Sequence, residues 1–282
     1  MNEKNINREL LDTYFKNNFS NGLVQHDFVL SALNGNSTRK LDTLLSTKTP
    51  NCNVNIAVKY VHSDIDLSLK TIEDFILLLK EVGLKIGIIY SNLSFSIVFQ
   101  RRIMSEYELQ LKVIGENNID EIKTFFEVFK IDGYDITIFP PNSWVTLNGL
   151  SKLNSNDLLC ILYPSLFELH TAALVKQIIY FKFYSPLSKG FSSDIFLKEQ
   201  ENIILLEDKS TKVEYYCKYY GVNTVNYRRI VSNQNRFTEI TGFLFSGNFF
   251  IQCSYILPLK YKKENIYLLD YLFSELKVQK ES

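Results

Sequence analysis

The sequence carries no net charge, because 31 Lys and Arg residues balance 31 Asp and Glu residues in a chain of 282. A chain without an overall positive field lacks the broad electrostatic attraction that holds proteins on nucleic acid, so only a local basic patch remains open for that role. Hydrophobic residues make up 46% of the chain and charged residues 22%. These proportions indicate a globular protein that buries a core.

Closely spaced cysteine pairs are also absent. The four cysteines stand at positions 52, 160, 217 and 253, far from the spacing of zinc sites. We expect buried thiols in a reducing compartment. The polar N-terminus lacks the apolar run of a signal peptide. No stretch approaches the roughly 20 apolar residues of a membrane span. The sequence therefore predicts a cytoplasmic protein with no membrane partner.

Several catalytic signatures are missing. The chain has no P-loop, no GxGxxG and no GxSxG motif. His26 and His170 have no neighbours at the spacing of a metal site or a catalytic triad. His62 has two interpretations, a phosphate contact or a partly buried, hydrogen-bonded histidine.

The apolar pattern of the first half predicts an α+β protein with a mixed β-sheet flanked by helices. Alternation over NVNIAVKY predicts a strand at 53–60. Helical spacing predicts a helix over 71–82, with Thr71 as its cap and Gly83 as its stop. We further expect two short helices over 7–33, the second at HDFVLSAL (26–33), a helix over 118–130, and β segments over 84–100, 107–114 and 134–139.

The second half is richer in aromatic residues and less regular. We expect helices over 212–220 and 263–277, and a hairpin over 239–257. A polar stretch near position 150 suggests a boundary between a first domain, 1–150, and a C-terminal helix-and-strand (α/β) domain, 151–282.

The candidate for chemistry is VHSDIDLSL (61–69). A strand directs residues i and i+2 to the same face, so Asp64 and Asp66 are expected to point the same way. Glu108 lies in a later β segment and adds a third carboxylate if the two strands are neighbours. Carboxylate clusters of this kind bind Mg²⁺, and bound Mg²⁺ aligns phosphates for in-line displacement.

The stretch NVNIAVKYVHSDIDLSL, with HDFVLSAL before it, resembles the nucleotidyltransferase fold of the DNA polymerase β superfamily. More narrowly, it resembles the abortive-infection nucleotidyltransferase toxins, over residues 20–115 and more faintly over 170–200. The resemblance implies that Asp64 and Asp66 bind Mg²⁺ and that Glu108 is the third carboxylate. It also implies a helical lysine, Lys176, and a later aspartate, Asp194.

The first hypothesis is therefore a metal-dependent nucleotidyltransferase, with a possible toxin or defence role, that transfers a nucleotide from NTP to an RNA or protein acceptor. Ser63 and Asn55 are then expected to contact phosphate.

Two alternatives stay open. The glycine turn of the family is replaced here by residues 52–55, where a Cβ restricts the approach of phosphate. This favours a catalytically degenerate binding or scaffolding subunit of a viral or mobile-element complex, with a protein partner on the C-terminal half. The third hypothesis interprets Asp64-Ile65-Asp66 as the Asp-x-Asp motif of a glycosyltransferase, although only 63 residues precede it.

Overall fold

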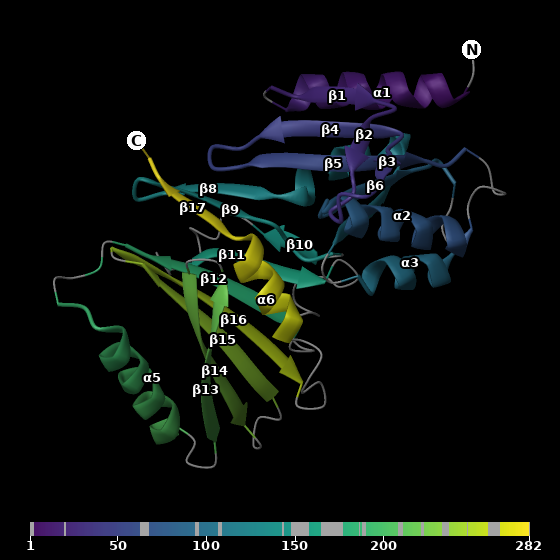
Figure 1. Cartoon of the computed structure of the whole chain (residues 1–282). Helices are drawn as coiled ribbons and strands as arrows, with labels where there is room; N and C mark the ends of the chain where they lie inside the picture. Colours follow the sequence, from purple (N-terminus) through teal and green to yellow (C-terminus); the bar gives the residue numbers. More distant parts are fainter. Residues whose placement is uncertain are drawn as a thin grey trace. The chain divides into compact units, whose positions relative to one another are not determined.

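The computed structural model shows a strand-rich α+β protein with several sheets and few helices (Figure 1). It describes residues 3–19, 21–62, 68–93, 96–106, 109–142, 144–147, 158–164, 177–185, 187, 190–207, 211–220, 223–232, 237–246, 248–258 and 266–281.

The chain divides into two compact units. Unit 1 comprises Met1–Val128, Tyr134–Ser143 and Lys277–Ser282, and unit 2 comprises Phe129–Gly133 and Trp144–Leu276. The boundary predicted near position 150 falls among residues 148–157, outside the described residues. The end of the chain returns to unit 1, which a simple cut at one position does not anticipate.

Unit 1 contains a five-stranded sheet in the order β1-β4-β5-β6-β7. Its strands are β1 (Leu23–His26), β4 (Thr43–Lys48), β5 (Asn53–Tyr60), β6 (Ile86–Tyr90) and β7 (Gln110–Ile114). β1, β4 and β5 pair antiparallel, whereas β5, β6 and β7 pair parallel. The predicted strand at 53–60 is confirmed.

Two helices connect the parallel strands, α2 (Leu69–Val82) and α3 (Ile97–Met104). Figure 1 shows both on one face of the sheet and α1 (Glu3–Asn18) on the other. Parallel crossovers of the same hand that step in one direction place their helices on one face. The predicted helix over 71–82 is confirmed, but its cap is Ser68, whose hydroxyl accepts the amide hydrogen of Thr71.

Four side chains of α2 are buried in the core of unit 1: Ile72, Phe75, Ile76 and Leu79. They pack with Ala57 of β5 and Leu111 of β7. Gly83 ends the helix at φ 72°, a left-handed backbone conformation that glycine adopts without a Cβ clash.

Three expectations for unit 1 were wrong. HDFVLSAL holds the end of β1 and the strand β2 (Val29–Ser31), because β1 pairs with β4 and β2 with β3 (Thr38–Lys40). The segment 84–100 is strand only as far as Tyr90, and Ser96 then caps α3 by accepting the amide hydrogen of Phe99. The segment 118–130 is divided between a 3₁₀ helix, η1 (Glu116–Phe125), and the strand β8 (Glu127–Ile131).

A separate sheet has three strands in the order β17-β9-β8. In it β17 (Lys277–Lys280) pairs antiparallel with β9 (Tyr134–Ile138). The end of the chain therefore pairs with β9, which ends at Ile138, and residues 277–282 belong to unit 1.

Unit 2 is built on a seven-stranded antiparallel sheet in the order β10-β11-β12-β16-β15-β14-β13. Its strands are β10 (Trp144–Leu147), β11 (Leu158–Pro164), β12 (Ile178–Tyr184), β13 (Lys212–Tyr220), β14 (Asn223–Ser232), β15 (Phe237–Ser246) and β16 (Phe249–Pro258). The predicted hairpin over 239–257 is confirmed as β15 and β16. The helix expected over 212–220 was wrong, because this segment is the edge strand β13 and pairs along its whole length with β14.

Helices α5 (Ser193–Glu207) and α6 (Ile266–Glu275) lie on opposite faces of this sheet (Figure 1). Phe273 of α6 packs on Phe181 and Tyr227, and Phe196 of α5 packs on Phe243 and Phe250. Tyr227 is paired with Gly242, and Phe243 is paired with Asn226. Paired residues share a face of the sheet and adjacent residues in a strand alternate, so Tyr227 and Phe243 lie on opposite faces.

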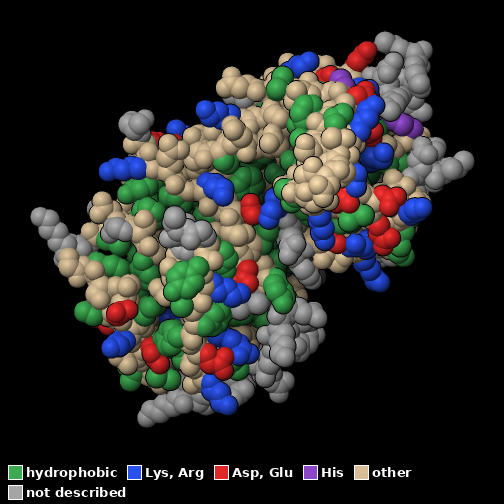
Figure 2. All heavy atoms as spheres, in the orientation of Figure 1, with side chains coloured by type: hydrophobic (Ala, Val, Ile, Leu, Met, Phe, Trp, Pro, Cys, Tyr) green, Lys and Arg blue, Asp and Glu red, His purple; other side chains and the backbone are tan. Residues whose placement is uncertain are grey.

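Charged side chains of both signs are interspersed over the face seen in Figure 2, and neither sign dominates its described part. Within the described residues, no helix is both long and apolar enough to cross a membrane.

Candidate functional site

Most of the predicted site residues lie outside the described residues: Ser63, Asp64, Asp66, Glu108 and Lys176. The residues that flank residues 63–67 are described. Val61 follows β5 directly, and its amide donates to the carbonyl of Tyr90, the last residue of β6, at 3.0 Å. On the other side, Ser68 begins α2. Both flanks therefore stand at the carboxyl ends of parallel strands, the edge at which open α/β sheets bind ligands.

Aromatic rings gather at this edge. The rings of Tyr60 and His62 are stacked with centroids 6.0 Å apart, and Tyr60 and Tyr90 are 5.7 Å apart. Burial raises the pKa of Tyr90. Both ring nitrogens of His62 are buried and have no hydrogen-bond partner among the residues that the structure describes. His62, one residue before Ser63, thus presents unsatisfied polar atoms.

A lysine and a carboxylate pair at the same edge, and sequence analysis missed both. Lys59 Nζ lies 3.5 Å from Asp42 Oδ2, which also accepts the amide hydrogen of Tyr60 at 3.1 Å. Asp42 precedes β4 directly, and Thr43 of β4 lies opposite Val58, so the hairpin register brings Asp42 and Lys59 together. The two residues are 17 positions apart in the chain, so sequence spacing alone does not indicate that they are close.

The structure places Asn55, and the strand that follows Glu108, away from this edge of the sheet. Asn55 is exposed in the first half of β5, opposite Ser46, roughly 17 Å along the strand from Tyr60. Gln110, two residues after Glu108, begins β7 beside Lys85 and Ile86, at the amino ends of the parallel strands. Asn55 therefore lies away from the carboxyl edge of the sheet, where β5 leads to Asp64. β7, the strand that follows Glu108, begins at the opposite, amino edge.

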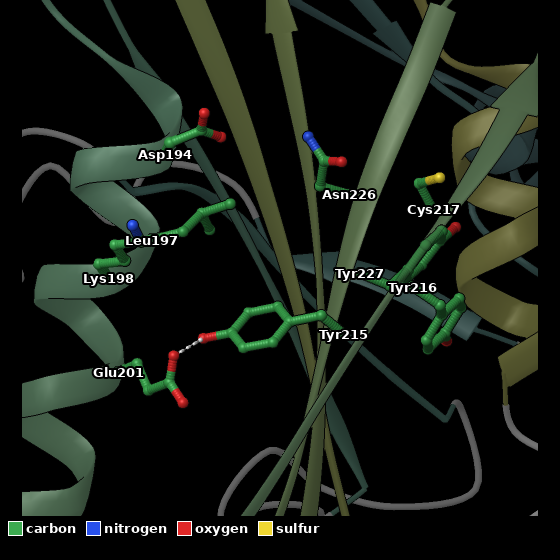
Figure 3. A pocket seen from close by; sticks show the side chains of 9 residues that line it. All are labelled: Asp194, Leu197, Lys198, Glu201, Tyr215, Tyr216, Cys217, Asn226 and Tyr227. Atoms are coloured by element: carbon green, nitrogen blue, oxygen red, sulfur yellow. Dashed lines mark hydrogen bonds between the residues drawn. The ribbon is translucent and has the colours of Figure 1, made fainter.

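Asp194 lies in unit 2, in the first turn of α5, and lines a hollow of about 580 Å³. Figure 3 shows this hollow between α5 and the outer strands of the sheet. Nine residues line it: Asp194, Leu197, Lys198 and Glu201 from α5, Tyr215, Tyr216 and Cys217 from β13, and Asn226 and Tyr227 from β14.

One hydrogen bond spans the hollow. The hydroxyl of Tyr215 donates to Oε2 of Glu201 at 3.1 Å (Figure 3). Burial raises the pKa of Tyr215 to about 12, and the hydrogen bond to the Glu201 carboxylate adds to the effect. The tyrosine therefore remains a donor over the whole physiological pH range, and it fixes one carboxylate oxygen of Glu201.

A buried arginine, Arg228 of β14, is the cross-strand neighbour of Tyr215. Arg228 is 4% exposed, sits directly opposite Tyr215, and has Glu239 Oε1 3.7 Å from its Nη2. Its guanidinium carbon lies 5.3 Å from the centre of the Phe243 ring. Burial lowers the pKa of Arg228, and the nearby Glu239 opposes that shift. Glu239 therefore lies near Nη2, whereas Nε and Nη1 are buried with no hydrogen-bond partner among the described residues.

No group of three or more His, Cys, Asp and Glu side chains in the described ranges is arranged to hold a metal ion. The predicted Mg²⁺ ligands, Asp64 and Asp66, lie outside those ranges.

No family model matches the chain, and no curated protein matches it. Among solved structures, it is similar to cyanobacterial PsbP (CyanoP) from Synechocystis sp. PCC 6803, at 10% identity and a TM-score of 0.38, over 55% of this chain and 94% of that one. It is also similar to a protein from Bacteroides thetaiotaomicron VPI-5482, at 13% identity and a TM-score of 0.34, over 52% of this chain and 46% of that one. Scores this low establish neither a shared fold nor a function.

Proposed function

We propose that unit 1 is a metal-dependent nucleotidyltransferase that takes NTP and Mg²⁺ and transfers a nucleotide to an RNA or protein acceptor, as toxin or defence enzymes do. The observation that carries this proposal is the place of β5 in the sheet. Asp64 and Asp66 follow its carboxyl end, where the edge of three parallel strands supplies Lys59 and His62.

The chemistry follows from the types of these side chains. Carboxylate oxygens are the ligands that Mg²⁺ prefers, so Asp64 and Asp66 would hold the metal and, through it, the phosphates. The acceptor hydroxyl attacks the α-phosphorus, the bond to the bridging oxygen breaks, and pyrophosphate leaves. Lys59 and the metal would offset the charge on the phosphates. Ser63 remains a phosphate contact in this scheme, whereas Glu108 and Asn55 lose the support of the sheet topology.

Titration calorimetry with each of the four NTPs, with and without Mg²⁺, tests the site. Asp64→Asn and Asp66→Asn should each weaken Mg²⁺-dependent NTP binding by at least about tenfold, because a charged ligand is lost. Asp74→Asn is the matched control, since Asp74 is exposed on α2. Undiminished binding in both site variants, with melting temperatures like that of the parent, would exclude the proposed site.

A second candidate function is Mg²⁺-dependent hydrolysis of a nucleic-acid phosphodiester, with water as the acceptor. The Asp42–Lys59 pair favours it, because a lysine beside a carboxylate can orient water and offset phosphate charge without the glycine turn that a triphosphate needs. Plasmid DNA and a linear RNA, incubated with Mg²⁺, are the substrates to assay. Lys59→Ala should abolish cleavage, and Lys48→Ala, at the exposed far end of β4, should not.

These two assays and one further assay also address the other hypotheses. Absence of both NTP binding and cleavage in the folded protein would favour the binding or scaffolding subunit. Manganese-dependent hydrolysis of UDP-glucose would favour the glycosyltransferase.

A further inference from the structure

Helix α5 brings charged side chains to the hollow. Its residues at i, i+3, i+4 and i+7 face the hollow, and three of these four are charged: Asp194, Lys198 and Glu201. Phe196 of the same helix packs on Phe243 and Phe250, so α5 also directs apolar side chains to the sheet. Asp194 and Lys198 are exposed and Glu201 is half-buried. The helix side of the hollow is therefore polar and open to solvent, as a site for a polar ligand requires.

The opposite wall of the hollow presents the side chains of Tyr215, Cys217 and Asn226, because the rings of Tyr216 and Tyr227 stack on each other on the α6 face of the sheet. Tyr215 points across it toward Glu201, and Asn226 adds an amide on the next strand (Figure 3). Leu197 completes an apolar surface on the side of α5. The volume, about 580 Å³, lies within the range of small-molecule sites. The hollow thus offers the Tyr215 ring and Leu197 as apolar surface, with a few polar groups beside them.

The charges on the lining select the sign of the ligand. Asp194 and Glu201 carry two negative charges and Lys198 one positive charge. Arg228 does not line the hollow, and the charges of both Glu239 and Glu201 act on it. Tyr215 engages Oε2 of Glu201, and Oε1 has no partner among the described residues. A carboxylate oxygen beside an aromatic ring attracts an ammonium group, both by charge and by cation–π interaction.

We propose that the hollow between α5 and the strands β13 and β14 binds a small organic cation, an amine attached to an aromatic or other apolar body. The ammonium group donates to Glu201, the body packs on Tyr215 and Leu197, and Asn226 accepts or donates a further hydrogen bond. An anion such as a nucleoside triphosphate is disfavoured here by Asp194 and Glu201. This site is therefore separate from the one proposed in unit 1.

Three probes of nearly equal shape and different charge test this assignment: phenethylamine, 2-phenylethanol and 3-phenylpropionate. Binding to the full chain is measured by saturation-transfer NMR and titration calorimetry. Phenethylamine should bind best, and Glu201→Gln should weaken it about tenfold because a charge-assisted hydrogen bond is lost. Glu199→Gln is the matched control, since it removes the same charge from an exposed position of α5 outside the lining.

A second variant keeps the test informative if Glu201→Gln perturbs folding. Tyr215→Phe retains the ring and frees Oε2 of Glu201, so it should bind phenethylamine at least as well as the parent. Equal binding of the three probes, equal weakening by Glu199→Gln, or preference for 3-phenylpropionate would each overturn the proposal. These results are independent of NTP binding, so failure here leaves the proposed function of unit 1 untouched.

Discussion

At the scale of single residues, Gly242 shows how closely α6 approaches the seven-stranded sheet. A Cβ at this position would lie 2.3 Å from Cε2 of Phe273, far inside contact distance. We expect Gly242→Ala to lower the free energy of unfolding by about 1–3 kcal/mol, because the Phe273 ring must leave its position over the sheet. Urea denaturation measures the change.

Phe273→Leu separates this clash from other causes. The smaller side chain should absorb much of the cost of Gly242→Ala, so the two changes should be non-additive. Gly190→Ala is a useful contrast, since Gly190 has a φ of 89° but no heavy atom within 4 Å of the added Cβ. Its effect would report backbone strain alone. Additive effects of Gly242→Ala and Phe273→Leu would show that the ring contact is not responsible.

Residue types and their spacing reveal part of the candidate sites. The i, i+2 spacing singles out Asp64 and Asp66, and β5 leads to them at the carboxyl edge of the sheet. Lys59 and Asp42 escape such a search, because only the register of the β4–β5 hairpin brings them together. The family resemblance singles out Asp194 as a later aspartate of a nucleotidyltransferase site. In the structure this residue lines the hollow of unit 2.

At the scale of secondary-structure elements, Glu106 joins the two helices that cover one face of the unit 1 sheet. Its carboxylate lies 2.8 Å from Lys80 Nζ of α2 and 2.5 Å from Arg102 Nη1 of α3. Burial alone would raise the pKa of Glu106, but hydrogen bonds and charges from Lys80 and Arg102 outweigh it and lower the pKa. The link should therefore depend on pH.

We expect Glu106→Gln to destabilise the protein by about 1–2 kcal/mol at pH 7, because two charged hydrogen-bond donors lose their anionic acceptor. The folded-state pKa lies below the unfolded value of about 4.3, so the stabilisation is present above that value and is lost as the pH falls through the folded pKa. Urea denaturation from pH 7 to pH 3 should show the parent and the variant converging. A constant difference would contradict the ionic link, and Asp74→Asn gives the baseline for losing one exposed carboxylate.

Asp270 fastens α6 to the edge of the unit 2 sheet in a similar way. Its carboxylate accepts the hydroxyl hydrogens of Tyr220 at 2.6 Å and Tyr227 at 3.2 Å, and it pairs with Lys218. Asp270→Ala would leave Lys218 and the buried Tyr227 without this acceptor. We expect the free energy of unfolding to fall by about 2–4 kcal/mol. Hydrogen exchange should quicken in α6 and β13, with β11 and β12 as internal controls. Unchanged protection of α6 would show that Phe273 packing suffices to hold it.

Local pattern predicted some elements well and others badly. The helix over 71–82 was recognisable because its apolar stripe and Gly83 agree with the packing. The segment KVEYYCKYY was misread as a helix, although Tyr and Val favour strands, because exposed Tyr215 and Tyr219 blur the alternation of an edge strand. Residues 97–100, the first half of α3, were misread as strand, since their apolar residues suit either period in so short a run.

At the scale of the whole molecule, the chain enters unit 2 at Phe129 and again at Trp144, and it returns to unit 1 at Tyr134 and at Lys277. The residues near position 150 do not predict the return at Lys277, because the pairing of β17 with β9 is long-range. The side chain of Asn51, in the turn between β4 and β5, stabilises the pairing of β17 with β9. Its amide donates to the carbonyls of Asp135 at 3.2 Å and Lys277 at 3.1 Å, and its carbonyl accepts the Thr137 hydroxyl at 2.5 Å.

Removal of residues 277–282 should therefore weaken unit 1, although these residues follow unit 2 in the chain. The deletion strips β9 of its β17 neighbour and leaves the Asn51 amide with one fewer acceptor. We expect amide hydrogen exchange to quicken in β9 and in the β4–β5 hairpin, whereas β15 and β16, in the middle of the unit 2 sheet, keep their protection. Asn51→Ala should reproduce a smaller part of the same pattern, and Lys280→Ala, which keeps the β17 backbone, should not. Loss of protection in β15 and β16, with β9 unaffected, would instead assign the end of the chain to the stability of unit 2.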